Sequence, residues 1–301
     1  MKNLIIKTLI GTVIVCLFSA AAIGQEKVFF KTLPVPSGTT PSTDPSIPTI
    51  GWNRWTTKNF TINSIDIDQG EYLFNNIESM KTWCLERWGL PDIQFSAECR
   101  IFCAPNVDMM KKLFNLDRTC GGVKQVDGKL VISYLWVVID GKPTEVIPSP
   151  LTIICLKEFN YQNRLNIGWW LYKGMSVLNS SIPQIKNNVV LASQNKTPFS
   201  SKSFFSATED DMRKATLEQK QLFDAQAATM CLLIRKEYGQ KKFLLFLRNS
   251  NSEHVVKEYL GFTNLETFDI TFHRFKDNLA NDISQNRTPD SYLQIEKLMQ
   301  K

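Results

Sequence analysis

The spacing of apolar residues separates a strand-rich first part of the chain from a helical second part. Residues 60–67, with Phe60, Ile62, Ile65 and Ile67, predict a strand or hairpin. Residues 100–103 predict a second strand, and residues 130–139, which are rich in β-branched side chains, predict a long buried strand.

Helices are predicted between these strands. Leu73, Ile77, Met80 and Cys84 recur at helical spacing, and Gly89-Leu90-Pro91 ends that helix. Residues 107–114 predict a short helix, and Cys120-Gly121-Gly122 predicts a turn. The predicted order is therefore β-α-β-α-β, which is typical of a mixed layer architecture.

After Pro148 the pattern is helical. Ser149-Pro150 resembles a cap followed by a first helical residue, and Leu151, Ile154, Cys155 and Glu158 then share one face. Polar residues 194–206 predict an exposed loop. Further helices are predicted over residues 216–237, 240–248 and from the capping box of Thr263 and Glu266 to about Leu279. The pattern predicts an α+β fold, a small mixed β-sheet subdomain followed by a helical subdomain.

The N-terminus has the pattern of a secretory signal peptide. Lys2 and Lys7 precede an apolar run from Leu9 to Phe18, and small residues follow as far as Gly24. The run is shorter than the roughly 20 residues that span a bilayer. Cleavage after Ala22 or Gly24 is therefore favoured over a retained helix, and over a lipoprotein anchored at Cys16. We expect a secreted or periplasmic (extracytoplasmic) protein with no membrane span after signal cleavage.

Composition sets the expected boundaries. Residues 1–24 form the signal peptide, residues 25–52 a linker rich in proline, serine and threonine, and residues 284–301 a C-terminal tail. Between them lies one domain, 53–283, made of a sheet part over 53–148 and a helical part over 149–283.

Charge and cysteine content narrow the function classes. The net charge is +6, but basic residues are spread along the chain, so we expect no nucleic-acid partner. Cys99 and Cys103 would lie four residues apart on one strand, too far to bridge each other, and Cys84 and Cys120 are the nearest candidate partners. Beyond the signal peptide an even number of cysteines favours disulfides, whereas buried thiols are an equal alternative for two of them, Cys155 and Cys231.

Four segments, in order, resemble the peptidase MA-like proteins, a branch of the gluzincin zinc metallopeptidases. In that family a mixed sheet precedes a helix with His-Glu-x-x-His, then a Trp-Leu-x-Glu-Gly segment and a helical tail. The resemblance covers most of residues 57–280 and implies a zincin-like fold with a cleft between its two parts. Its segments are 156–161 (Leu-Lys-Glu-Phe-Asn-Tyr), 170–176 (Trp-Leu-Tyr-Lys-Gly-Met-Ser), 225–239 and 259–262.

The positions that would bind zinc depart from the family pattern. The two histidine positions hold Lys157 and Tyr161, and the third ligand position holds Lys173, so that only the general base, Glu158, keeps its type. An ammonium group has no lone pair for a metal. Both histidines of the chain, His254 and His273, lie far downstream. We therefore expect no zinc, no other cofactor and no catalytic residue.

The resemblance implies an inactive metallopeptidase-like protein that binds a peptide, protein or cell-surface partner in its former active-site cleft. The cleft candidates are Lys157, Glu158, Tyr161, Trp170, Tyr172 and Lys173. The alternatives are an active zinc-dependent peptidase with unrecognised ligands and a purely structural exported module. Lys173, or less favourably Lys157, is predicted to neutralise Glu158; alternatively both lysines extend into water.

Export predicts a specific mature terminus. The protein recovered outside the cytoplasm should begin near Ile23 or Gln25 and stay in the supernatant when membranes are pelleted, because the apolar run is removed with the signal. N-terminal sequencing checks this, and recovery of Met1 from an extracytoplasmic fraction would contradict it.

Overall fold

The structure is a computed structural model that describes residues 52–138, 143–194 and 199–293. The expected signal peptide, the linker as far as residue 51 and residues 294–301 of the tail lie outside the described residues. Among the described residues, no helix is long and apolar enough to cross a membrane.

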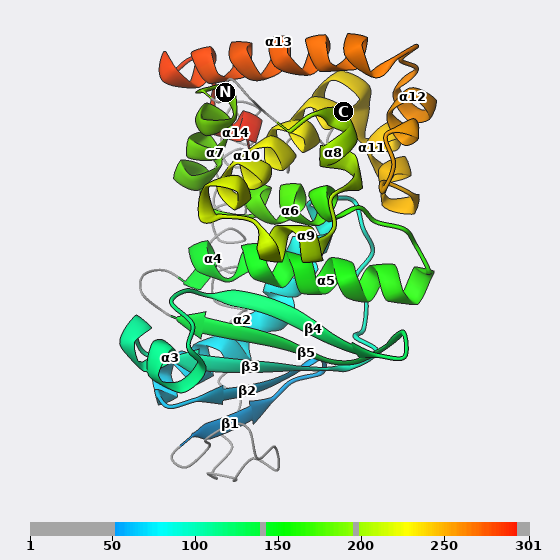
Figure 1. Ribbon diagram of the computed structural model, residues 1–301. Helices are drawn as coiled ribbons and strands as arrows, with labels where there is room; N and C mark the ends of the chain where they lie inside the picture. Colours follow the sequence, from blue (N-terminus) through cyan, green and yellow to red (C-terminus); the bar gives the residue numbers. More distant parts are fainter. Residues whose placement is uncertain (1–51, 139–142, 195–198, 294–301) are drawn as a thin grey trace, which may run out of the picture.

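One five-stranded mixed sheet forms the first layer (Figure 1). Its strand order is β1-β2-β3-β5-β4, with β2, β3 and β5 parallel and the two edge strands antiparallel to their neighbours. The sheet, with the helices that follow it, confirms the α+β class. The strands are β1 (Asn53–Thr56), β2 (Phe60–Ser64), β3 (Glu98–Ala104), β4 (Cys120–Val126) and β5 (Lys129–Val138).

Helix α2 (Ile67–Glu86) covers one face of this sheet and α3 (Val107–Phe114) the other. The four residues of the predicted apolar stripe in α2, Leu73 to Cys84, are buried. Gly89, at φ 69°, turns the chain after the helix, as the Gly-Leu-Pro signal predicts.

The predicted strand at residues 60–67 is confirmed over Phe60–Ser64 as β2, but two other details of the sheet differ from the prediction. Ile65 and Ile67 belong to no hairpin, because Asp66 caps α2 by accepting from the Gln69 amide, and β1 supplies the second strand of the hairpin. Cys120-Gly121-Gly122 is the start of β4 rather than a turn. A Cβ on Gly121 would lie 3.1 Å from the Pro150 carbonyl oxygen, so the glycine permits a close approach to a helix.

The second part of the described chain is helical, as predicted. Helix α5 runs between the sheet and the helices above it, beside the edge strand β4 (Figure 1). The helices are α4 (Pro143–Val146), α5 (Pro148–Asn163), α6 (Trp169–Leu178), α7 (Ile182–Gln194), α8 (Ser201–Ser206), α9 (Glu209–Lys214), α10 (Leu217–Leu233), the π-helix η1 (Ile234–Tyr238), α11 (Gly239–Arg248), α12 (His254–Leu260), α13 (Leu265–Ser284) and α14 (Asp290–Leu293).

Three local signals in this part have other outcomes than predicted. Ser149 does not cap α5, since the helix begins at Pro148 and the Ser149 hydroxyl bonds to Ser176 instead. The cap of α13 is Asn264, whose side chain accepts from the Thr267 amide, not a capping box at Thr263. Residues 201–206 form α8 rather than a loop, because Phe204 and Phe205 are fully buried.

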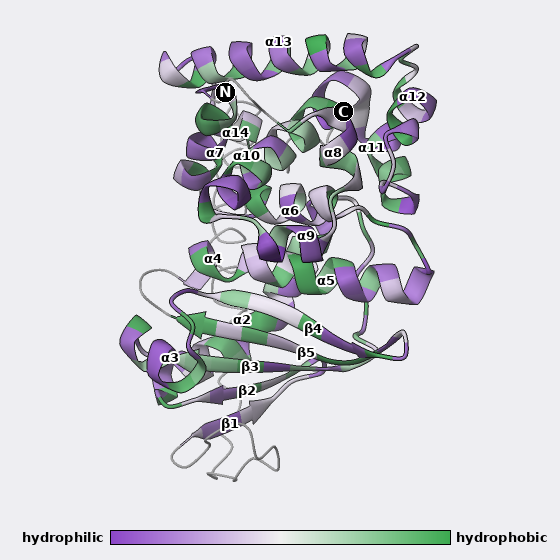
Figure 2. Ribbon diagram, in the orientation of Figure 1, coloured by the Kyte–Doolittle hydropathy of each residue, from purple (hydrophilic) through white to green (hydrophobic). Residues whose placement is uncertain are grey.

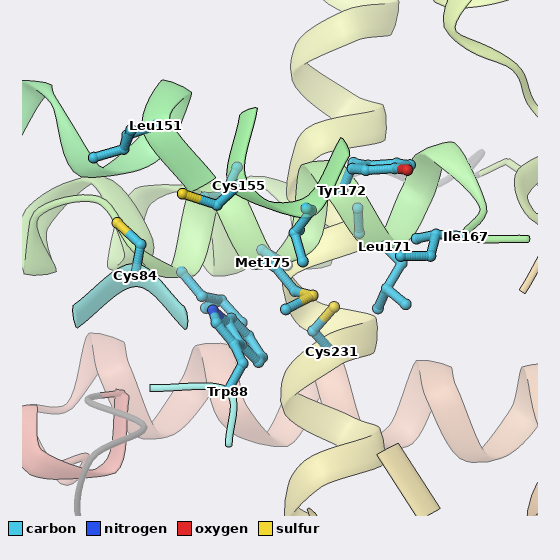
Figure 3. Packing of buried hydrophobic residues seen from close by; sticks show 14 of the residues in the cluster. Cys84, Trp88, Leu151, Cys155, Ile167, Leu171, Tyr172, Met175 and Cys231 are labelled. Atoms are coloured by element: carbon cyan, nitrogen blue, oxygen red, sulfur yellow. The ribbon is translucent and has the colours of Figure 1, made fainter. Parts of the chain in front are cut away.

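A single cluster of buried residues extends from the sheet to α13. In Figure 3 the side chains of Met175 on α6 and Cys231 on α10 meet inside it. Gly174 makes this contact close, because a Cβ there would lie 2.5 Å from the carbonyl oxygen of Ala227. The glycine of the family-like segment therefore sets the distance between α6 and α10.

The described cysteines are free thiols, and all except Cys120 are buried. Cys155 and Cys231 are thus buried apolar groups, the alternative to disulfides that the sequence leaves open. Burial raises the pKa of the Cys84 and Cys103 thiols to about 12.

Gly174→Ala should lower the free energy of unfolding by about 2–3 kcal/mol, because the new methyl group overlaps backbone atoms of α10 that cannot move alone. Gly122→Ala is the matched control: no atom lies within 4 Å of its Cβ position. Its stability should stay equal or rise by less than about 1 kcal/mol. Urea unfolding of both variants checks this, and equal losses would contradict the close packing of α6 on α10.

Candidate functional site

Helix α5 presents two different faces at the positions of the family-like motif. Its residue Glu158 points toward the sheet layer, whereas Lys157 and Asn160 line a groove on the other side. The predicted cleft residues are therefore not all brought together.

Glu158 is fully buried and anchors α5 to the segment before β3. Its carboxylate accepts hydrogen bonds from the Ser96 amide (3.0 Å), the Ser96 hydroxyl (2.7 Å) and the Ala97 amide (3.3 Å). The Gln162 side-chain amide donates a fourth at 3.3 Å. Oriented N–H and O–H donors stabilise a buried carboxylate without a cation.

Lys157 pairs with a residue that the sequence did not connect to it. Its Nζ lies 2.6 Å from a carboxylate oxygen of Glu209 on α9, and 5.5 Å from the centre of the Trp169 ring. Burial alone would raise the pKa of Glu209, but the bonds and charges of Lys157 and Arg213 hold it below its ordinary value.

Lys173 pairs with Asp224 on α10, at 2.9 Å between Nζ and the carboxylate oxygen. Burial raises the pKa of Asp224, and the Lys173 ammonium opposes that rise. The prediction that a lysine neutralises Glu158 is wrong, and so is the alternative that both lysines extend into water. Each lysine forms its ion pair with a carboxylate on a helix that lies far downstream in the sequence.

The aromatic candidates differ in position. Trp170 is fully buried, its Nε1 donates to the Ser250 carbonyl oxygen at 2.8 Å, and it is a core residue rather than a cleft residue. Tyr172 is buried but lines the groove, and Figure 3 shows its hydroxyl pointing away from Met175 and Cys231. Burial raises its pKa. Tyr161 is half-buried and lies outside the groove lining.

The groove has two lobes that share the wall formed by Trp169, Glu209 and Arg213. The larger lobe has a volume of about 740 Å³ and the smaller one about 470 Å³. Residues 123–125 of β4 line the first lobe, and residues 118–121 line the second. Opposite them stand α5, α6, α9 and the start of α10.

The sequence prediction missed the α9 and β4 walls. The signal for α9 was present, since Thr208 and Asp211 form a capping box around its first turn. The position of α9 beside the groove depends on tertiary packing, which local sequence patterns do not predict.

Strand β4 is an edge strand whose outer side faces this groove. Apart from its ladder with β5, no hydrogen bond between residues of the described ranges ends on the backbone of Cys120–Val126. The strand therefore offers backbone donors and acceptors to an incoming chain.

The side chains at the three ligand positions do not fit zinc. Two are ammonium groups held in ion pairs, and the third is a tyrosine outside the groove lining. Over residues 52–138, 143–194 and 199–293, no three His, Cys, Asp or Glu side chains come together as a metal site.

No protein-family model, curated protein or solved structure matches this chain. Its site is therefore interpreted from its own geometry.

Lys173→Met should lower the free energy of unfolding by about 1–2 kcal/mol near neutral pH, because the Asp224 carboxylate loses the cation that offsets its desolvation. Without Lys173 the pKa of Asp224 rises further. Protonation then removes the unpaired charge, so the loss should shrink as the pH falls through that pKa. Urea unfolding at about pH 7 and about pH 4.5 measures both effects.

A double-mutant cycle separates the two candidate partners. Lys173→Met and Asp224→Leu should couple by about 1 kcal/mol or more, whereas Lys173→Met and Glu158→Gln should add within about 0.5 kcal/mol. Coupling with Glu158 instead of Asp224 would restore the pairing predicted from the sequence.

Proposed function

We propose that this protein is an exported, non-catalytic member of the peptidase MA-like group that binds an extended peptide segment of a partner. The proposed binding site is the two-lobed groove between β4 and helices α5, α6 and α9. One observation carries the proposal. Lys157 forms an ion pair with Glu209 and Lys173 forms one with Asp224, and the groove beside these pairs is open.

The proposed loss of catalysis rests on the general-base position as well as on the metal positions. A general base has to reach the proton that it removes, directly or through one water molecule. The Glu158 carboxylate has no exposed surface, and its bonds to Ser96 and Ala97 occupy both oxygens. In this position the group stabilises the fold rather than activating water.

The arrangement of elements supports the zincin-like assignment. The helix with the degenerate motif, α5, lies against β4, and the helix with the Trp-Leu-x-x-Gly segment, α6, packs on α5. Gly174, the glycine of that segment, permits the close contact of α6 with α10. On this assignment the groove is the former cleft.

Strand addition is the mode of binding that the groove favours. A peptide that pairs with β4 gains main-chain hydrogen bonds, and the lobes on its other side accept alternate side chains. The lining on this side of the groove runs from Arg118, two residues before β4, to Gln125. At about 3.3 Å per residue it spans roughly 25 Å, enough for about seven or eight residues of an extended peptide.

Peptide binding without cleavage is the prediction. Immobilised protein comprising residues 25–301 should retain members of a random eight-residue peptide library and return them intact, with or without added zinc. The same library with alternate N-methylated amides should be retained about tenfold less, because methylation removes donors for the ladder. Mass spectrometry of the retained peptides and metal analysis of the protein are the measurements.

A pair of tryptophan substitutions locates the binding site. Gln125→Trp places a bulky ring on the β4 wall of the larger lobe and should weaken retention of the peptides about fivefold or more. Val131→Trp, at an exposed position of β5 outside the lining, is the matched control and should leave retention unchanged. Stoichiometric zinc with chelator-sensitive hydrolysis would instead establish an active peptidase. Absence of any retention would favour a structural module.

A further inference from the structure

The groove carries most of the charge imbalance of the molecule. Six lysine and arginine side chains line its two lobes, against two carboxylates, a surplus of four positive charges. The cations are Arg118, Lys124, Lys157, Lys173, Arg213 and Lys220, and the carboxylates are Glu209 and Asp224.

This surplus equals the net charge of the whole chain beyond the signal peptide. The full chain has a net charge of +6, and Lys2 and Lys7 are the charged residues of the first 24, which leaves +4. The rest of that chain is therefore balanced. The spread of basic residues along the sequence concealed this concentration, because the six cations come from β4, α5, α6, α9, α10 and the approach to β4.

The carboxylates of the groove are already engaged. Glu209 is in contact with both Lys157 and Arg213, and Asp224 with Lys173. Within the described part of the chain, Arg118, Lys124 and Lys220 have no ion pair. The charge of Arg118 also acts on Asp224, but none of the three cations is in direct contact with a carboxylate of the described residues.

These three cations flank the path of an added strand. Lys124 lies on β4 and Arg118 two residues before that strand, six residues apart in the sequence, and Lys220 lies on the α10 side of the smaller lobe. Figure 2 shows α9 and the end of β4 next to β5's start as hydrophilic. A concave surface with a surplus of positive charge raises the local concentration of negatively charged groups.

We propose that the ligand of the groove is an acidic polypeptide segment, with Asp or Glu at alternate positions, bound as an added strand along β4. This proposal rests on the proposed function and adds the chemical class of the segment. The main-chain ladder is independent of sequence, so the charge of the groove supplies the selectivity.

Three labelled sets of eight-residue peptides test the proposal on the protein comprising residues 25–301. The sets carry Glu, Gln or Lys at alternate positions and the same mixture of residues elsewhere. Fluorescence polarisation should show the Glu set binding about tenfold more tightly than the Gln set and the Lys set more weakly still. Salt at about 300 mM should reduce the difference, because it screens exposed charges.

Two triple variants assign the effect to the groove. Arg118→Gln with Lys124→Gln and Lys220→Gln should remove most of the preference for Glu over Gln, measured as the ratio of the two affinities for the same variant. Lys202→Gln with Lys241→Gln and Arg274→Gln changes the net charge equally at exposed positions outside the groove lining and should keep the preference.

The outcomes separate this inference from the proposed function. Equal binding of the Glu and Gln sets, or equal effects of the two triple variants, would overturn the proposed selectivity for acidic segments. Such a result would not contradict peptide binding by strand addition. Binding of none of the sets would overturn the proposed function itself. An eight-nucleotide oligothymidylate that displaced the Glu set at equal concentration would also overturn the proposal, because the ligand would then be a nucleic acid.

Discussion

The position of α5 depends on a buried carboxylate that, among the described residues, is stabilised by hydrogen-bond donors rather than by a cation. Glu158 accepts two backbone amides and a hydroxyl from the segment that leads into β3, so the central helix is tied to the sheet at one point. Because α5 also forms a wall of the groove, this tie fixes the distance between β4 and the helices opposite. A shorter or uncharged side chain at residue 158 would leave buried amides unpaired as well as loosening the helix.

Patterns within one element were predictable from sequence, and contacts between distant elements were not. The stripe of α2 from Leu73 to Cys84 and the long strand β5 followed from periodicity, because a buried face repeats with the period of its element. The partners of Lys157 and Lys173 lie about fifty residues downstream, on α9 and α10, and no local spacing identifies them.

The errors also have physical causes. Two consecutive glycines are typical of a turn, yet at the start of β4 they allow a strand to approach α5. Trp170 belongs to the family-like segment and was assigned to the cleft, but its ring lies against Phe205 and Phe246 in the core. The sequence could place Glu158 on the apolar face of α5 but could not show that the apolar face and the groove face are different.

On the proposed export, the buried thiols set a condition on how the chain reaches this fold. Thiol reactivity requires the thiolate, and burial that raises the pKa of Cys84 and Cys103 makes these groups inert once the core has formed. In an oxidising compartment they are exposed to disulfide exchange only before that moment. Cys99 on β3 and Cys155 on α5 are buried in the same core, so a bridge formed early to the wrong partner would trap strands and helices apart. For such a chain, folding has to finish before oxidation begins, and its fate is decided by relative rates rather than by the stability of the final state.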